Sequence, residues 1–244
     1  MPTQETASAR EQVPFYPWDT FLSTYFRWVQ GEHCALIGPT GSGKTSLMLR
    51  ILTLRAYVVV MATKPRDSTL NALQREGYRR MQQWDTHLPA RKYPRRLLWP
   101  DASQMYSAHV QQREFVAAMD AIYRVGYWCV CIDELWYLIH HLKMAFEVKT
   151  YLQQARSLKI SLLVGTQRPA FVPVEIYDQS SHLFFWLDND ETNLKRISGI
   201  SYRSSHLIRD VVSSLEKHEV LYIHRDTGFM CRTMAPPPTA KGAA

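Results

Sequence analysis

The segment from Gly38 to Thr45 constrains this chain more than any other, because it reads Gly-Pro-Thr-Gly-Ser-Gly-Lys-Thr and matches the phosphate-binding pattern Gly-x-x-x-x-Gly-Lys-Thr. Its glycines permit positive φ, so consecutive backbone N–H groups can turn inward around phosphate oxygens. An apolar run, 34–37, precedes the loop and a helix-like run, 46–52, follows it, as a phosphate site at a helix N-terminus requires. The sequence therefore predicts a nucleoside triphosphate site made by Gly38, Pro39, Thr40, Gly41, Ser42, Gly43, Lys44, Thr45 and Ser46.

A pair of carboxylates, Asp133 and Glu134, comes directly after the apolar run 128–132. Ligands bind at the C-terminal ends of strands in α/β sheets, so we expect this pair beside the phosphate loop. Lys44 is expected to reach the β- and γ-phosphates, while Thr45 and Asp133 hold Mg²⁺. Glu134 is expected to polarise the attacking water, which predicts hydrolysis and disfavours a small-molecule kinase. The expected cofactors are Mg²⁺ and ATP, the latter as the default because no residue is recognised as reading the base.

A third polar strand end, Gln167, follows the apolar run 162–164 one strand–helix unit after the carboxylates. At that place a glutamine can sense the γ-phosphate or orient the water beside Glu134. We therefore include Gln167 among the predicted catalytic residues.

Apolar runs of strand type alternate with helical patterns, which predicts an α/β fold with a mostly parallel sheet, helices on both faces and a C-terminal antiparallel hairpin. The predicted strands are 34–37, 57–62, 96–99, 128–132, 160–164 and 182–187, the helices are 19–29, 110–125 and around 150–157, and the hairpin pairs 220–223 with 229–232. One domain, 14–234, is expected between a flexible N-terminal arm, 1–13, and a flexible Pro/Ala tail, 235–244.

The chain of 244 residues carries a net charge of +7, which is compatible with a nucleic-acid partner and equally with a merely basic surface. Two clusters are candidates for phosphate contact, and the first is slightly favoured because it follows Glu134 directly. The first comprises His140, His141, Lys143 and Lys149, and the second Arg75, Arg79, Arg80, Arg91, Lys92, Arg95 and Arg96, interleaved with Tyr78, Trp84 and Tyr93. Basic and aromatic residues together suit backbone contact and base stacking, although charge runs are commonly just solvated surface.

No apolar run approaches the ~18 residues that span a bilayer, and the N-terminus lacks the apolar core of a signal peptide. We therefore expect no membrane segment, and a cytoplasmic or virion-associated protein.

The phosphate loop, the strand ending in Asp133-Glu134 and the segment 154–169, which reads Gln-Ala-Arg-Ser-Leu-Lys-Ile-Ser-Leu-Leu-Val-Gly-Thr-Gln-Arg-Pro, together resemble the FtsK–HerA family of DNA-pumping ATPases. The resemblance implies a P-loop NTPase of the additional-strand, catalytic-glutamate type that works as a homo-oligomeric ring, usually a hexamer, around double-stranded DNA. A bare motor of this size is most similar to the genome-packaging ATPases of viruses and phages. The partners implied are a viral portal or capsid vertex, or the machinery of a mobile element.

Ring motors of this type complete each site with an arginine from the neighbouring subunit. Arg156 matches the Ala-Arg position of the resemblance, and Arg168 is the second candidate; either can instead be an ordinary surface arginine. The leading hypothesis is thus an ATP-hydrolysing motor that translocates double-stranded DNA in genome packaging or mobile-element transfer. The alternative is an assembly or secretion ATPase of the phage-extrusion type that acts on protein.

Overall fold

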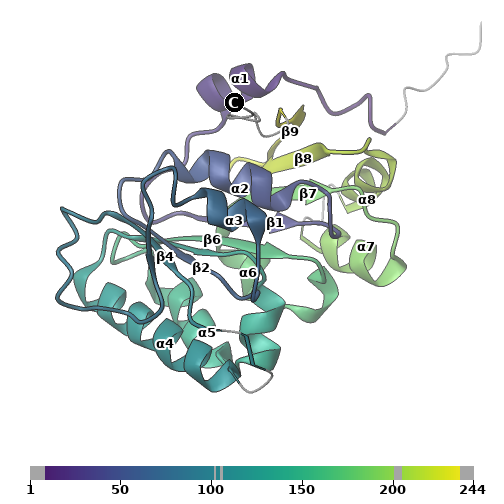
Figure 1. Ribbon diagram of the computed structural model, residues 1–244. Coiled ribbons are helices and arrows are strands. Elements are labelled where there is room, and N and C mark those ends of the chain that lie inside the picture. The colour runs from purple at the N-terminus through teal and green to yellow at the C-terminus, as the bar shows by residue number, and fades with distance from the viewer. Residues whose placement is uncertain (1–8, 102, 105–106, 201–204, 237–244) are drawn as a thin grey trace, which may run out of the picture.

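The computed structural model describes residues 9–101, 103–104, 107–200 and 205–236. Its centre is a nine-stranded sheet in the order β3-β4-β2-β5-β6-β1-β7-β8-β9 (Figure 1). The strands from β3 to β7 in this order pair in parallel, whereas β8 pairs antiparallel with both of its neighbours. The predicted α/β class, the mostly parallel sheet and the C-terminal hairpin are confirmed.

The strands are short and most are buried along their length, as expected for a sheet covered on both faces. They are β1 (His33–Ile37), β2 (Val58–Met61), β3 (Arg79–Met81), β4 (Arg95–Leu98), β5 (Cys129–Ile132), β6 (Ser161–Thr166), β7 (Ser180–Trp186), β8 (Glu219–His224) and β9 (Phe229–Met234). Strand β6 lies between β1, which leads into the phosphate loop, and β5, which ends before the two carboxylates. This is the additional strand that the resemblance implies.

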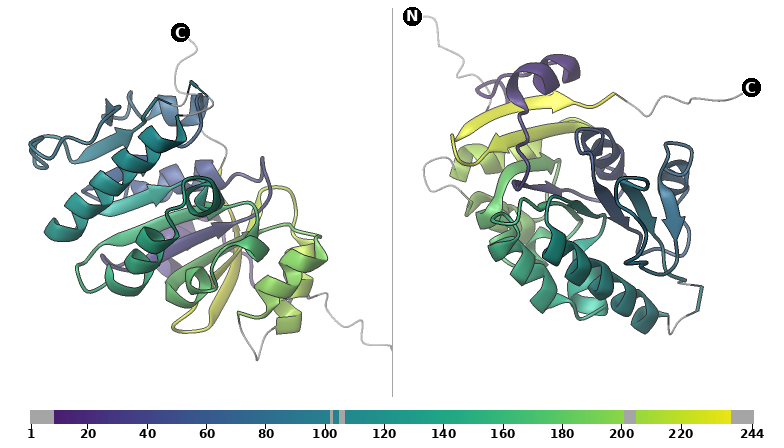
Figure 2. Two further views of the ribbon diagram at one scale, coloured as in Figure 1. Left: turned by 90° about the horizontal axis from the view of Figure 1, so that it is seen from below. Right: turned by 90° about the vertical axis from the view of Figure 1, so that its left-hand side faces the viewer.

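Helices cover both faces of the sheet, with α2 and α3 on one side and α4 and α5 on the other (Figures 1 and 2). The longer helices are α2 (Lys44–Leu52), α4 (Ala108–Val125), α5 (Ala145–Gln154), α7 (Glu191–Ser198) and α8 (Ser205–Ser214). The shorter ones are α1 (Trp18–Thr20), α3 (Ser68–Ala72) and α6 (Glu175–Gln179), the π-helical turns η1 (Phe21–Tyr25) and η2 (Tyr137–His141), and the 3-10 turn η3 (Pro169–Phe171).

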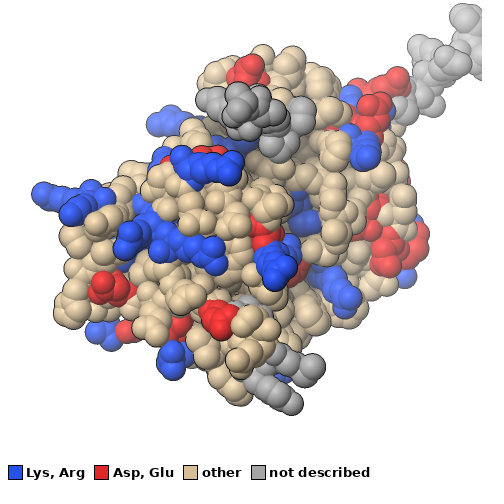
Figure 3. Space-filling view, viewed as in Figure 1, with Lys and Arg blue, Asp and Glu red and all other residues tan. Residues whose placement is uncertain are grey.

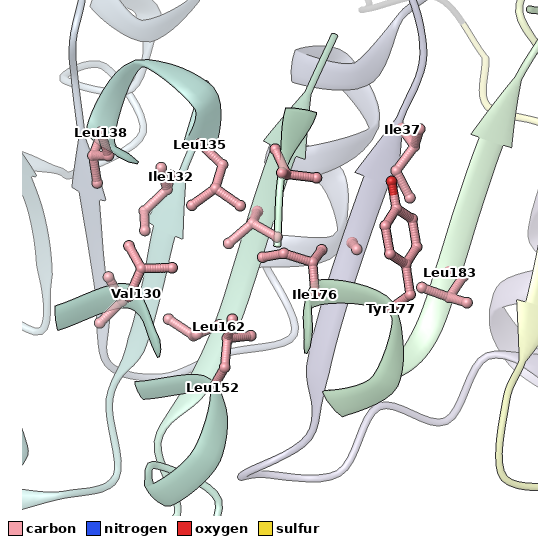
Figure 4. Close-up of a cluster of buried hydrophobic side chains, with 14 of the residues drawn as sticks. Ile37, Val130, Ile132, Leu135, Leu138, Leu152, Leu162, Ile176, Tyr177 and Leu183 are labelled. Atoms are coloured by element: carbon pink, nitrogen blue, oxygen red, sulfur yellow. The ribbon is translucent and has the colours of Figure 1, made fainter. Parts of the chain in front are cut away.

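Two cores lie on opposite faces of the sheet, because successive side chains of a strand point to opposite sides. In β5, for example, Val130 and Ile132 face the core under α4 and α5, whereas Cys129 and Cys131 face the core under α2. Figure 4 shows the first core, where side chains of β1, β5, β6 and β7 meet those of α5 and α6. All four cysteines of the chain are buried and free, as a reducing environment allows.

The predicted helix 19–29 is only partly correct. Helical turns run from Trp18 to Tyr25, and Phe26 leaves the helical region with φ −98° and ψ 89°. The reason is tertiary: Phe26 packs edge-on against Phe184 and Tyr222, where a continued helix would not place it. Val29, predicted on the apolar stripe, is 48% exposed.

Part of the segment predicted as a flexible arm is packed against the end of the sheet. Val13 is buried, and Arg10 forms ion pairs with Glu216 (2.6 Å) and Glu219 (3.0 Å). Just beyond it, backbone hydrogen bonds join Pro14 and Tyr16 to β9, and Figure 2 shows the following helical turns lying against β8 and β9. The packed body thus begins before residue 14. Of the predicted tail, residues 237–244 lie outside the described part of the chain.

Candidate nucleotide and magnesium site

The phosphate loop is a tight connection between the end of β1 and the start of α2. Gly41 and Gly43 have φ of +76° and +107°, which side chains other than glycine disfavour. Gly38 is needed for a different reason, because a Cβ there would lie 2.7 Å from Cβ of Trp186 on β7. The loop is therefore shaped both by its own dihedral angles and by the neighbouring strand.

Lys44 lies inside the loop. Its Nζ donates to the carbonyl oxygens of Gly38 (2.6 Å) and Pro39 (2.7 Å). Burial lowers the pKa of Lys44 to about 8, and the carboxylates of Glu134 and Asp133 oppose that shift. Two carbonyl groups thus hold the lysine where a triphosphate would arrive, and phosphate oxygens would supply stronger acceptors for the same ammonium.

Thr45 and Asp133 meet at the predicted metal position. The Thr45 hydroxyl donates to Oδ1 of Asp133 over 2.9 Å, and Asp133 is buried at the end of β5. A hydroxyl and a carboxylate are oxygen ligands of the kind that Mg²⁺ prefers, with waters and phosphate oxygens completing its shell. The donor set therefore fits a magnesium ion bound together with a nucleotide.

Glu134 is largely buried beside Asp133. Burial raises its pKa, while Lys44 and the backbone N–H groups of Trp136 and Gln167 act in the opposite direction. Its Oε1 is buried without a hydrogen-bond partner among the described residues. A buried acceptor without a partner is rare in proteins, and here it is suited to hold a water.

Glycine at position 165 brings the strand of Gln167 close to the carboxylates. A Cβ there would lie 2.4 Å from the carbonyl oxygen of Asp133, so a larger residue would push β6 away from β5. At the end of this strand, Oε1 of Gln167 accepts a hydrogen bond from the hydroxyl of Thr40 in the phosphate loop (2.5 Å). Gln167 therefore contacts the phosphate loop directly, whereas the sequence predicted only that it would lie near the γ-phosphate and Glu134.

We expect Gln167→Ala to leave ATP affinity within about twofold of wild type and to slow hydrolysis by 10-fold or more, since one positioned polar group typically contributes on the order of 10²-fold. Binding of a labelled ATP analogue and steady-state hydrolysis would measure the two effects separately. Thr40→Ala is the matched control, because it removes the partner of the hydrogen bond and keeps the glutamine. A loss confined to affinity would show that Gln167 only supports the loop.

Two recesses adjoin the loop. A polar one of about 260 Å³ is lined by Thr40, Gly41, Gly43, Lys44, Thr45, Ser46, Lys64, Thr69, Asp133, Gln167 and His218. An apolar one of about 220 Å³ is lined by Ser42, Gly43, Ser46, Leu47, Trp186, His218, Met234, Ala235 and Pro236. Sequence reasoning missed Lys64, Trp186 and His218, which come from strand ends and a loop that carry no recognised motif. His218 is fixed at the loop by Nδ1, 3.1 Å from the carbonyl oxygen of Ser42.

The two arginines predicted as fingers lie at opposite ends of the sheet. Arg156 precedes β6, and its carbonyl oxygen lies 3.1 Å from the Cβ position of Gly31 ahead of β1. It is therefore at the N-terminal end of the parallel strands, away from the phosphate loop of its own chain. Arg168 follows Gln167 at the loop end, where its guanidinium lies 5.1 Å from the ring centre of Trp136.

The second basic cluster is divided by the fold. Arg75, Arg79, Arg80, Arg91 and Lys92 are exposed and Arg95 is half-buried, and Figure 3 shows Lys and Arg gathered on the left-hand part of this face. Arg96 is only 2% exposed, however, and its guanidinium lies 4.7 Å and 4.9 Å from the ring centres of Trp84 and Trp128. It donates to the carbonyl oxygens of Tyr93 and Leu88, so its prediction as a phosphate contact is wrong.

Aromatic side chains of this cluster are engaged within the protein. Tyr78 is buried, and Trp84 packs edge-on against Trp128. Tyr93 is half-buried, with the cations of Arg79 and Lys92 within 6 Å of its ring centre. The buried ring of Tyr78 is thus closed to base stacking in this conformation, and the exposed groups of the cluster are mainly cations.

The first basic cluster lies after Glu134 but is partly occupied. Lys149 forms an ion pair with Glu175 (3.0 Å), and Nε2 of His140 is 2.8 Å from the carbonyl oxygen of Phe171. His141 stacks on Tyr137, and Lys143 is exposed.

Among the described residues no helix is long and apolar enough to cross a membrane.

No protein-family model matches this sequence, and no curated protein matches it. Among solved structures, the chain is similar to the genome packaging NTPase B204 from Sulfolobus turreted icosahedral virus 2 in complex with AMPPCP, with a TM-score of 0.63, 16% identity, and 84% of this chain and 97% of that chain covered. It is also similar to B204, the DNA-packaging ATPase from Sulfolobus turreted icosahedral virus (TM-score 0.62, 17% identity, 86% and 99% covered). VirB4 of Thermoanaerobacter pseudethanolicus gives a TM-score of 0.59 at 11% identity, with 84% and 90% covered. The expected P-loop NTPase fold and the resemblance to FtsK–HerA ATPases are confirmed at the level of fold.

Proposed function

We propose that this chain is an ATP-hydrolysing motor that works as a homo-oligomeric ring, with six subunits expected, and translocates double-stranded DNA in genome packaging or mobile-element transfer. The observation that supports hydrolysis most strongly is the pairing of Thr45 with Asp133 at 2.9 Å, beside Glu134, whose buried Oε1 has no hydrogen-bond partner in the described part of the chain. A metal-holding pair and a water-holding carboxylate together are what triphosphate hydrolysis requires. A nucleotide switch or a small-molecule kinase has less need of a carboxylate that holds a water.

The apolar recess supports a bound nucleotide base. It adjoins the polar phosphate recess and shares Gly43, Ser46 and His218 with it, so a base and its phosphates can occupy both at once. Its volume is about 220 Å³, and Trp186, Leu47 and Met234 give it an apolar lining. Structures of B204 from Sulfolobus turreted icosahedral virus 2 are in complex with AMPPCP, ATP-gammaS and AMP, which is in line with ATP here.

Double-stranded DNA as the substrate is supported by the fold shared with a DNA-packaging ATPase and by the exposed basic residues of β3 and the loop before β4. Arg and Lys without a base-reading motif predict binding that is electrostatic and independent of sequence. The decisive experiment measures ATP hydrolysis with and without double-stranded DNA at low salt. Stimulation by DNA is expected, and a chain that hydrolyses ATP but neither binds DNA nor responds to it would contradict the proposal.

The logarithm of the DNA affinity should fall linearly with log salt, with a slope of about −0.9 per phosphate contacted. Replacing Arg91, Lys92 and Arg95 with Ala should flatten that slope by up to about three units, if each contacts one phosphate. Replacing Lys143 and Lys149 with Ala tests the rival surface and removes a comparable charge. Fluorescence anisotropy over a salt series measures both slopes, and an unchanged slope in the first variant would assign DNA to the other surface.

If one subunit donates an arginine finger to the site of its neighbour, rings that mix two different variants should recover activity. Arg156→Ala subunits lack the finger that they would donate, and Glu134→Gln subunits lack the base of their own site. Mixing the two should therefore create interfaces with an intact site and an intact finger, and activity above that of either variant alone is expected. The same mixture with Arg168→Ala tests the second candidate. Rings that mix but recover no activity at any ratio would count against the arginine tested.

A protein substrate is the alternative, and one surface favours it. Phe146 is 78% exposed, and Phe171 and Val174 are also exposed around the Lys149–Glu175 ion pair. Exposed apolar side chains of this size are suited to a protein contact. ATP hydrolysis that is insensitive to DNA in the experiment above would favour this alternative.

A further inference from the structure

Lys64 lies beside the metal-binding carboxylate, although it belongs to no motif of the phosphate site. It follows β2 by three residues, and β2 pairs with β5, so that Met61 lies opposite Ile132 and the two strand ends are adjacent. Its Nζ is 3.3 Å from Oδ2 of Asp133. The other oxygen of the same carboxylate accepts from Thr45. Asp133 is thus contacted from both sides, by the metal-binding hydroxyl and by a lysine.

The backbone of Lys64 is anchored while its side chain remains half-exposed. The indole N–H of Trp99 donates to the carbonyl oxygen of Lys64, and the side-chain amide of Gln111 donates to that of Thr63, both over 2.8 Å. The Lys64 side chain is 47% exposed and points into the recess. Two neighbouring elements therefore fix where the side chain starts, which positions its ammonium without burying it.

Lys64 lines two cavities that meet at the reaction centre. One is the phosphate recess, which it shares with Lys44, Thr45 and Gln167. The other, of about 210 Å³, is lined by Glu134 together with Thr63, Lys64, Pro65, Gln104, Ser107, Ala108, Gln111 and Tyr137. In the proposed function, the γ-phosphate would lie in the first cavity, which Lys44 and Thr45 line, and a water at Glu134 would lie in the second. Lys64 stands at their boundary.

We propose that Lys64 is a second catalytic lysine, which contacts the γ-phosphate opposite Lys44 and stabilises the charge on its oxygens during hydrolysis. In this step the water oxygen bonds to the γ-phosphorus as the bond to the β,γ-bridging oxygen breaks, and Glu134 takes up the water's proton. ADP and inorganic phosphate leave. Positioned cations that meet charge in the transition state are the main source of catalysis in phosphoryl transfer. This inference rests on the proposed ATP hydrolysis and adds a cation from within the same chain.

The ammonium of Lys64 lies between two carboxylates, those of Asp133 and Asp67. Asp67 is 3.5 Å from Nζ and also caps α3, accepting from the N–H groups of Thr69 and Leu70. A cation held between two carboxylates can transfer one of its contacts to a phosphate and keep the other.

The test compares Lys64→Met with wild type for affinity as well as turnover. With Mg²⁺ present, we expect wild type to bind AMPPCP more tightly than ADP. In Lys64→Met, the ratio of the two affinities should fall by about 10-fold, because AMPPCP binding weakens while ADP affinity stays within about twofold of wild type. The maximal hydrolysis rate should fall by roughly 10²-fold or more, since a cation at the γ-phosphate can contribute 10³-fold. Calorimetric titration measures the affinities without turnover.

Two controls separate a γ-phosphate contact from structural support. Arg66→Met removes a positive charge two residues away that lines neither cavity and should leave both readouts unchanged. Asp67→Asn keeps a good helix cap and removes the second carboxylate partner, so the preference for AMPPCP should persist. The proposal is overturned if Lys64→Met keeps the preference, or if it weakens ADP and AMPPCP equally. Because the binding readout needs no turnover, it decides about Lys64 even if wild type failed to hydrolyse ATP, a result that contradicts only the proposed function.

Discussion

Glu134→Gln is expected to bind ATP and Mg²⁺ with near wild-type affinity and to hydrolyse the nucleotide at least about 100-fold more slowly, as the loss of a positioned base predicts. The amide keeps the size of the side chain and leaves Thr45 and Asp133 in contact. It cannot accept the water's proton. Because Oε1 of Glu134 is buried without a partner among the described residues, the substitution acts where the water is expected to be held.

A rapid-quench measurement of bound nucleotide would show ATP persisting on Glu134→Gln long after wild type has converted it to ADP. Asp133→Asn is the informative comparison, since it removes the metal-binding carboxylate and should weaken Mg²⁺-dependent binding instead. Glu76→Gln, on an exposed part of the chain, controls for the loss of one carboxylate. Wild-type turnover by Glu134→Gln would show that Glu134 does not activate the water.

Lys44→Ala should lose triphosphate binding by at least about 30-fold, because truncating one partner of a desolvated charge pair costs roughly 2 kcal/mol or more. Two effects combine in this variant. The cation that faces the β- and γ-phosphates is removed, and the carbonyl groups of Gly38 and Pro39 lose the ammonium that ties the loop together. Hydrolysis should fall below detection at nucleotide concentrations that saturate wild type.

Equilibrium binding of a fluorescent ATP analogue measures this loss. Lys92→Ala, which removes an exposed lysine far from the loop, serves as the charge-matched control and should bind normally. Thermal unfolding of Lys44→Ala without nucleotide shows whether the loop contacts matter to the fold. Retention of wild-type affinity in a folded Lys44→Ala protein would mean that the triphosphate does not bind in this loop.

Much of the site was predictable because its chemistry is local. The phosphate loop is one continuous segment whose glycines and lysine act through their own backbone and side chain. The strands before Asp133 and Gln167 can be recognised in the sequence as apolar runs, because strands buried on both faces contain few polar residues. Parallel pairing then brings their C-terminal ends to one edge, so three separate segments converge without any tertiary detail being known.

Other parts depend on contacts that the sequence does not display. Lys64 follows a strand that was predicted, yet nothing marks it until β2 is seen to lie beside β5. The short helices α3 and α6 fall below the length at which periodicity is informative. The N-terminal segment has an amphipathic pattern, but packing of Phe26 against the sheet ends the helix early.

Arg96 illustrates how a charge run can mislead. Next to Arg95 it reads as one more solvated cation, whereas its position on β4 turns it inward between two tryptophan rings. Neighbouring residues of a strand face opposite sides, so the two arginines cannot both be exposed on one face. Period-2 alternation places Arg96 on the same face of β4 as Leu98, which is fully buried.

The two borders of the sheet bear on how copies of this chain can associate. On the outer side of β9, the backbone N–H of Arg232 donates to the carbonyl oxygen of Pro14 (2.7 Å), and its carbonyl oxygen accepts from the N–H of Tyr16 (2.8 Å). The opposite border is the three-residue β3 carrying Arg79 and Arg80. A covered edge strand and a short, charged edge strand both disfavour the addition of a strand from another chain. Subunits of a ring would then meet through side chains and not through one sheet running from copy to copy. In such a ring, a shift of one subunit against its neighbour would break no ladder of main-chain hydrogen bonds.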